Sequence, residues 1–217
     1  MKMAANALLK NGKVIARSFA QASSIRSLHN DKVYELRTYS ITPKNFKEFY
    51  DLSVEYMHLR TNHSKLVGYW TSEIGGIFDM VHIWEYDNLQ HRAKVRQAMT
   101  GDQEWSSKYI SKVFPMMERL ENVLLKLDSK SSLEQTNTGG VYEICCTEKP
   151  LKELPNTKGD GQLLGTFSTL IGSLNTSYQL WYHKSLDALV SSADLGTYGT
   201  HSTKSRLLLP TPWSPMK

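Results

Sequence analysis

The stretch that decides the fold is Leu66–Asn88, LVGYWTSEIGGIFDMVHIWEYDN, which has the pattern of two strands and a tight turn. Leu66–Ile74 and Met80–Tyr86 are rich in aromatic and β-branched residues, which favour strands. Gly75 and Gly76 lie between them and tolerate the positive φ angles that a hairpin turn requires. This stretch therefore predicts a β-hairpin at the centre of a sheet.

A second, weaker copy of the hairpin lies at Leu163–Leu186, LLGTFSTLIGSLNTSYQLWYHKSL. The matched residues recur at a constant spacing of 97, without a gap: Gly68/Gly165, Trp70/Phe167, Ile74/Ile171, Gly75/Gly172 and Trp84/Trp181. Self-similarity at a fixed spacing indicates an internal duplication. The chain is therefore predicted to contain two copies of one structural unit.

The first copy is predicted to cover residues 32–128 as a ferredoxin-like βαββαβ unit. Val33–Ile41 alternates as a strand, and apolar residues at helical spacing follow it through Arg60. After the hairpin, Asp87 and Gln90 suggest the start of a second helical region, which Gly101 ends. A further helix and a last strand follow, carried by Trp105, Tyr109, Val113 and by Val123–Leu127.

The second copy is predicted to cover residues 141–217, after a polar linker at 129–140. VYEI at Val141 corresponds to VYEL at Val33, but the segments that would carry the two helices are about 11 and 13 residues shorter. We therefore expect an α+β fold of tandem ferredoxin-like units, packed as a dimeric α/β-barrel-like pair, with eroded helices in the second unit. Its outer face should then leave apolar residues exposed, from the set Leu163, Leu164, Phe167 and Leu170.

Composition places the excess positive charge at the start of the chain. The 217 residues include 26 basic and 21 acidic residues, and residues 1–31 hold five basic residues and no acid before Asp31. The remainder is neutral, which argues against nucleic-acid binding. Residues 1–31 have the composition of a mitochondrial presequence, the alternative being a disordered tail. No stretch is apolar enough for a membrane span. Cys145 and Cys146 are adjacent, so their side chains point to opposite faces of a strand, and we expect them to be packed thiols.

Four segments make the chain similar to the NIPSNAP family, and to its shorter, third-type subgroup: VYELRTY, HLRTNHSKLVGYW, VHIWEYDNLQHRAKVRQAM and LLLPTPWSPMK. The resemblance covers the chain from about Lys32 and is strongest in the first half. It implies a dimeric α/β-barrel-type arrangement and a mitochondrial location, in the matrix or at a membrane, with the cytosol as an additional location. It also implies protein partners, in mitochondrial quality control (mitophagy) or vesicle transport, but no settled chemistry.

Strand alternation gathers polar residues that could line a ligand pocket. Glu35, Arg37 and Tyr39 share one face of the first strand, and His82 and Trp84 share one face of the third. Unpaired charges would be costly beneath the helices. We therefore expect Glu35 and Arg37 to face the space between the two sheets, where a polar pocket would form. The alternative is a buried ion pair that only fixes sheet packing.

A second group lies at the predicted end of the first helix: His58, Arg60 and His63. His58 and His63 are five residues apart, which is not the spacing that places two ligands on one helix face. Cationic side chains are favoured at a helix C-terminus by the helix dipole, which accounts for Arg60 and His63 without a ligand. No metal ligand, cofactor or catalytic residue is assigned.

Two functions remain open. The first is a non-enzymatic mitochondrial interaction or adaptor protein, with protein partners and self-association as its modes of action. The second is a small-molecule-binding protein or cofactor-independent enzyme of the α/β-barrel type. A cavity lined by both Arg37 and His82 would favour the second function.

Overall fold

The computed structural model describes residues 32–133, 139–148, 151–191 and 203–217. The expected leader at 1–31 and part of the expected linker, 134–138, lie outside the described residues. Among the described helices, none is long and apolar enough to cross a membrane.

The central hairpin forms as its sequence predicts. β2 spans Lys65–Ile74, β3 spans Asp79–Tyr86, and Gly75 and Gly76 adopt φ angles of 90° and 159° in the turn. Its glycines are needed because these angles are strained for residues with a Cβ atom. The flanking strands of the first half are β1, Val33–Ile41, and β4, Met117–Leu127, which begins six residues earlier than predicted.

Helical segments fill the two connections of the first half. α2 covers Phe46–Thr61 after a short 3₁₀ turn, η1, at Pro43–Asn45. The second connection begins with α3, Leu89–Gly101, whose first turn is capped by Asn88 rather than by the predicted Asp87. The Asn88 side chain accepts a hydrogen bond from the His91 amide at 2.8 Å. The remaining segments are η2 at Trp105–Ile110, α4 at Ser111–Val113 and η3 at Phe114–Met116.

The second half has four strands in the same order as the first, and the helical segments among its described residues are short. Its strands are β5 at Val141–Thr147, β6 at Gln162–Ile171, β7 at Ser177–His183 and β8 at Thr203–Pro210. Between them, the described helical segments are a 3₁₀ turn, η4, at Leu151–Glu153 and the six-residue α5 at Leu186–Ser191. In the described part of the chain, the helical segments of the second half are therefore shorter than α2 and α3.

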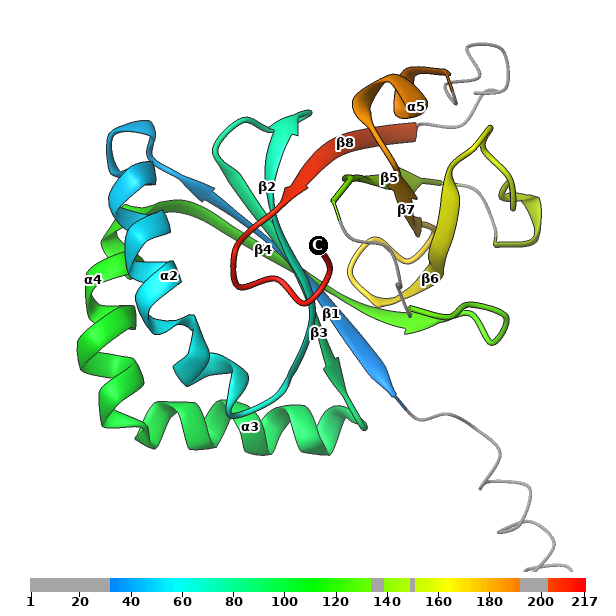
Figure 1. Ribbon diagram of the computed structural model, residues 1–217. Coiled ribbons are helices and arrows are strands. Elements are labelled where there is room, and N and C mark those ends of the chain that lie inside the picture. The colour runs from blue at the N-terminus through cyan, green and yellow to red at the C-terminus, as the bar shows by residue number, and fades with distance from the viewer. Residues whose placement is uncertain (1–31, 134–138, 149–150, 192–202) are drawn as a thin grey trace, which may run out of the picture. The chain divides into compact units, whose positions relative to one another are not determined.

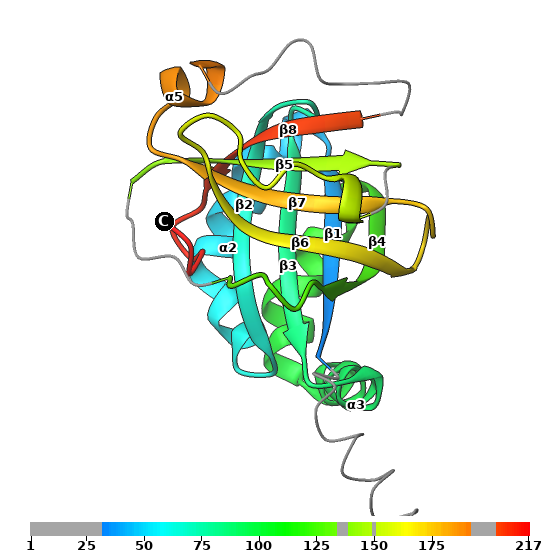
Figure 2. The same cartoon turned by 90° about the vertical axis from the view of Figure 1, so that its right-hand side faces the viewer.

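All eight strands close into one barrel in the order β1-β3-β2-β8-β5-β7-β6-β4. Each half contributes four strands in the same relative order, and antiparallel pairs β2–β8 and β4–β6 join the halves. Figures 1 and 2 show the strands of the second half crossing those of the first, with α2, α3 and α4 on the far side of the first half. The two ferredoxin-like sheets therefore pair within a single chain.

The barrel interior is an apolar core supplied by both halves. Tyr34 from β1 packs edge-on against Phe167 from β6, with ring centroids 5.6 Å apart, and Trp70 from β2 packs against Tyr142 from β5 at 5.4 Å. A second core lies between the outer face of the first sheet and its helices, and includes Phe49, Met57, Tyr69, Met80, Trp84, Val95, Trp105 and Tyr109.

The outer face of the second sheet is covered without long helices. Trp181 on this face is almost fully buried, and Leu154 from the segment after η4 is buried with it. Of the four apolar residues expected to be exposed, Leu164 and Phe167 are buried in the barrel interior and Leu163 is half-buried. Only Leu170 is exposed. The expectation therefore holds for Leu170 alone, because barrel closure takes up the inner face and an irregular segment covers the outer one.

The duplicated Gly-x-aromatic pattern has a packing cause that mutation can test. A Cβ atom on Gly68 would lie 2.2 Å from the ring of Trp70, which is fully buried. We predict that Gly68→Ala lowers the free energy of unfolding by about 1–3 kcal/mol, as overpacking does. Gly101→Ala is the control, since a Cβ atom there meets nothing within 4 Å. Equal denaturation midpoints for the two variants would contradict this account.

Candidate functional site

β1 and β3 are neighbours in the first half and present their polar side chains on one common face. Their register places Arg37 opposite His82 and Glu35 opposite Trp84, with Tyr39 two residues further along β1. The intervening residues point into the barrel interior, as alternation requires: Tyr34, Leu36, Val81 and Ile83.

This polar face is turned toward the helices, so the expectation that Glu35 and Arg37 face the space between the two sheets is wrong. A closed barrel of eight strands is just wide enough for side chains to fill it. Here apolar side chains form its core, beside a second cavity of about 340 Å³ that interior residues such as Leu36, Val81 and Ile144 line. The desolvation cost on the helix side is offset because the charges there are paired with each other and with hydrogen-bond donors.

The Glu35 carboxylate organises this face. It is 1% exposed and accepts hydrogen bonds from Arg92 at 2.6 Å, Asn122 at 2.6 Å, Arg37 at 3.1 Å and the Tyr86 hydroxyl at 3.3 Å. Burial alone would raise its pKa, but the hydrogen bond from Arg92 and the charge of Arg37 outweigh burial and lower the pKa to about 2. Glu35 is therefore an ionised anchor for the arginines and a poor proton acceptor.

Arg60 brings a second guanidinium to the same place. It lies in the last turn of α2, is 3% exposed, and stacks over Trp84 with 3.8 Å between the guanidinium carbon and the ring centroid. It donates hydrogen bonds to the Ser64 hydroxyl at 2.7 Å and the Tyr86 hydroxyl at 3.1 Å. Among the described residues no carboxylate forms an ion pair with it. Its charge is therefore held by neutral oxygens and an aromatic face.

His82 lies between the arginines and the aromatic side chains. It is 3% exposed, and its ring stacks on that of Tyr69 with centroids 4.4 Å apart. Burial, followed by the nearby charges of Arg37 and Arg60, lowers its pKa well below 6.5, so the ring is neutral at pH 7.

The tautomer of His82 follows from one contact. Its Nδ1 accepts a hydrogen bond from the Trp84 indole N–H at 2.6 Å. Because an indole nitrogen can only donate, the ring proton of a neutral His82 must lie on Nε2. Nε2 and the Nε of Arg37 are buried donors without a hydrogen-bond partner in the described part of the chain. Such unpaired buried donors are rare in proteins.

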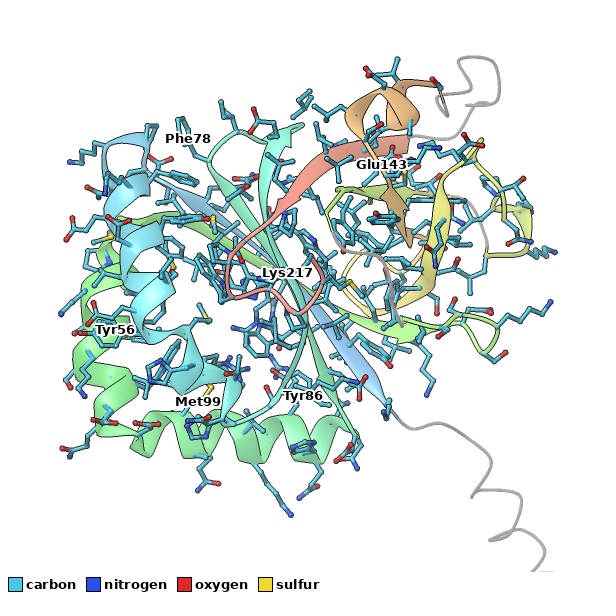
Figure 3. All side chains as sticks on the ribbon, viewed as in Figure 1. Tyr56, Phe78, Tyr86, Met99, Glu143 and Lys217 are labelled. Carbon is cyan, nitrogen blue, oxygen red and sulfur yellow. The ribbon has the colours of Figure 1, made fainter. Side chains whose placement is uncertain are left out.

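These groups lie on the floor of a cavity of about 400 Å³ between the first sheet and its helices. Arg37, Tyr39, Arg60, His82 and Trp84 all line it. The other walls come mainly from apolar and aromatic side chains, among them Met57, Tyr69, Met99, Trp105, Tyr109 and Phe114. Figure 3 shows Met99 on α3 and Tyr86 at the end of β3 on this helix-covered side, away from Glu143. Pockets for small ligands have this size and this mixture of apolar walls and a few polar groups.

An irregular helix forms one wall of the cavity. η2, Trp105–Ile110, is a π-helix, a form that is often found at functional sites. It directs Trp105 and Tyr109 to the cavity with ring centroids 4.7 Å apart. The Tyr109 hydroxyl is 2.7 Å from the hydroxyl of Ser53 on α2, which ties the wall to the neighbouring helix.

The predicted helix-end group does not form one site. His58 is exposed, His63 binds Asp102 with 2.8 Å between Nε2 and Oδ2, and only Arg60 enters the cavity. Helical periodicity could have identified Arg60, because it continues the buried stripe of Phe49, Ser53 and Met57. Arg92 and Asn122 gave no comparable signal.

Among the described residues no cluster of three His, Cys, Asp or Glu side chains could hold a metal ion.

The second half contains a modified copy of the same arrangement. Glu143 pairs across the strands with Trp181, as Glu35 does with Trp84, and Cys145 takes the place of Arg37 opposite Gln179. Lys158 closes over Glu143 with contacts of 2.5 and 2.7 Å. Both cysteines are free, Cys145 buried and Cys146 half-buried. Here the segment that carries Lys158 lies where the first half has its cavity.

The structure defines the class of the protein. It is an α/β-barrel protein built from two ferredoxin-like halves, with a closed eight-stranded barrel, helices on one side and a cavity beneath them. A putative monooxygenase from Fusobacterium nucleatum shares this fold, with a TM-score of 0.58 over 88% of this chain and all of that chain, at 10% identity. That likeness concerns the fold alone.

The sequence relatives are more specific. Protein NipSnap homolog 3A from Homo sapiens is 32% identical over 85% of both chains, and protein NipSnap homolog 3B from Mus musculus is 31% identical over 87% of both. The NIPSNAP family model matches residues 34–132. The chain belongs to the NIPSNAP family, as its sequence predicted.

The Glu35 network predicts a specific response to acid. Its folded-state pKa is lowered from 4.5 to about 2, so the unfolded state binds more protons as the pH falls between these values. The stability from Glu35 is therefore present above about pH 4.5 and is lost toward pH 2. We predict that Glu35→Gln costs about 3–5 kcal/mol at pH 7 and reduces the loss of stability on acidification.

Chemical denaturation at pH 7, 4 and 2.5 measures both effects. Glu118→Gln is the matched control, because Glu118 is an exposed glutamate on β4. If Glu35→Gln and Glu118→Gln gave the same stability at pH 7, the Glu35 carboxylate would not anchor the arginines.

Proposed function

We propose that this NIPSNAP protein binds a small organic molecule in the cavity between its first sheet and α2, α3 and η2. One observation carries the proposal: the floor of a cavity of about 400 Å³ holds a buried, unpartnered N–H of His82. A buried donor without an acceptor costs free energy. A ligand that supplies the acceptor would recover that cost.

Ligand binding is favoured over acid–base catalysis at this site. The only carboxylate in contact with the floor arginines among the described residues is Glu35, and four donors hold it ionised. The neutral His82 carries its proton on the unpartnered nitrogen, and its other nitrogen is engaged by Trp84. It therefore donates a hydrogen bond to a bound oxygen and does not remove a proton from it.

A pair of neighbouring serines gives a direct test. Ser106 lines the cavity, whereas Ser107 is exposed and does not. We predict that Ser106→Trp fills the cavity and abolishes capture of metabolites, measured by mass spectrometry of the purified full-length chain after incubation with a metabolite extract. Ser107→Trp should capture the same compounds as the unaltered protein. A compound set unchanged by Ser106→Trp would refute ligand binding in this cavity.

A second candidate is a non-enzymatic interaction or adaptor role, in mitochondrial quality control or vesicle transport, as the family resemblance implies. It is favoured by exposed apolar side chains at the β6–β7 hairpin, where Leu170, Ile171 and Leu174 are 41%, 61% and 69% exposed. A second copy of the chain would cover them. Ser106→Trp and Ser107→Trp separate ligand binding from the interaction role, because neither substitution alters the β6–β7 hairpin.

We further propose that residues 1–31 direct the protein to mitochondria. Five basic residues and no acid before Asp31 support this. A fluorescent reporter fused to residues 1–31 should accumulate in mitochondria. The same fusion with Lys10, Lys13 and Arg17 changed to glutamine should remain in the cytosol, since import of such segments depends on their positive charge. A diffuse signal from the unaltered fusion would contradict the proposal.

A further inference from the structure

The chemistry of the cavity indicates what kind of molecule fits it. Three charged side chains line it, Arg37, Arg60 and Arg96, and all are cationic. Glu35 neutralises only part of this charge, because it is shared between Arg37 and Arg92. The floor therefore retains a positive charge on largely buried side chains, where electrostatic attraction is stronger than at an exposed surface.

The second half of the chain shows what the unpartnered donor is missing. Gln179 occupies on β7 the position that His82 occupies on β3, and each faces the equivalent residue of the neighbouring strand, Cys145 and Arg37. The Nε2 of Gln179 donates to the backbone carbonyl oxygen of Pro155 at 2.8 Å. At the equivalent place in the first half, no oxygen of the described chain meets the Nε2 of His82. By this internal comparison the missing group is an oxygen acceptor.

The charge balance also differs between the halves. Glu143 is matched by Lys158, which the covering segment supplies, and His183 lies 3.4 Å from the same carboxylate. In the first half Arg37 and Arg92 share the Glu35 carboxylate, Arg60 stacks over Trp84 without a carboxylate partner among the described residues, and a cavity lies over this floor. A negatively charged oxygen would accept the hydrogen bond from the Nε2 of His82 and would also balance the excess positive charge of the arginines.

The upper part of the cavity fits an aromatic body. Trp105 and Tyr109 lie side by side on η2, and Met99 and Phe114 complete an apolar wall. Aromatic rings stack on one another in offset or edge-to-face geometry, and methionine sulfur contacts ring edges favourably.

We infer that the ligand is an aromatic carboxylate, with its carboxylate between Arg37, Arg60 and the Nε2 of His82 and its ring system against Trp105 and Met99. This inference rests on the proposed function and specifies the ligand class of the same cavity. The planar carboxylate offers two oxygens to two single N–H donors, the Nε of Arg37 and the Nε2 of His82.

Calorimetry on the full-length chain tests the inference with 2-naphthoate, its neutral analogue 2-naphthamide, and decanoate. The unaltered protein should bind 2-naphthoate at least tenfold more tightly than either of the others. Arg60→Met, which removes the charge and retains an apolar side chain, should weaken 2-naphthoate at least tenfold and change 2-naphthamide less than twofold. Arg96→Met, at the exposed edge of the cavity, should weaken 2-naphthoate less than threefold. The comparison of ligands on the unaltered protein does not depend on how well Arg60→Met folds.

The outcomes separate this inference from the proposed function. Equal binding of 2-naphthamide and 2-naphthoate, with both lost in Ser106→Trp, would overturn the anionic ligand and retain the ligand site. Tighter binding of decanoate would overturn the aromatic class in the same way. Absence of 2-naphthoate binding would overturn the inference as well, and the proposed function would then stand or fall on the metabolite capture alone.

Discussion

The ion-pair network of Glu35 is the interaction on which the first half depends. Its carboxylate joins β1 to α3 through Arg92, to β4 through Asn122 and to β3 through Tyr86. A buried charge would be costly if unpaired, so these donors must remain in place for the sheet and helices to pack. The same pairing holds Arg37 against the floor of the cavity. Structural stability and the chemistry of the candidate site therefore depend on one carboxylate.

The two halves together close the barrel within one chain, and they differ in what lies over their polar faces. Both halves supply strands in the same order, and each provides half of the apolar interior. The first half places helices over its outer face, which leaves space beneath them. The described helical segments of the second half are short, and a segment that carries Lys158 and Pro155 contacts the equivalent polar groups directly. Gln179 of the second half thus donates to an oxygen of the chain, whereas the Nε2 of His82, at the equivalent place beside the cavity, has no partner among the described residues.

The local sequence pattern predicted the strands and the hairpin turn. It also predicted the common face of Glu35, Arg37, His82 and Trp84, because strand alternation depends only on neighbouring residues. It did not predict which side of the sheet that face would occupy. From sequence alone, the cost of burying an unpaired Glu35 carboxylate argued against the helix-covered side of the sheet. That argument does not hold in the structure, because Arg92 and Asn122, which lie 57 and 87 residues away in the sequence, pair with the carboxylate. Arg60 was assigned to the helix dipole although its spacing from Phe49 and Met57 placed it on the buried stripe. Of the apolar residues expected to be exposed in the second half only Leu170 is exposed, because the segment that covers the sheet is irregular and its sequence has no periodic pattern that predicts this role.

The central claim is that the cavity floor presents a neutral histidine with its proton on an unpartnered nitrogen. Nitrogen-15 NMR of the His82 ring in the ligand-free chain measures this state directly, through the chemical shifts of Nδ1 and Nε2. The account predicts the neutral tautomer with the proton on Nε2 at pH 7, and no titration near pH 6.5. A ring that titrates near its ordinary pKa of 6.5, or that carries its proton on Nδ1, would contradict the account.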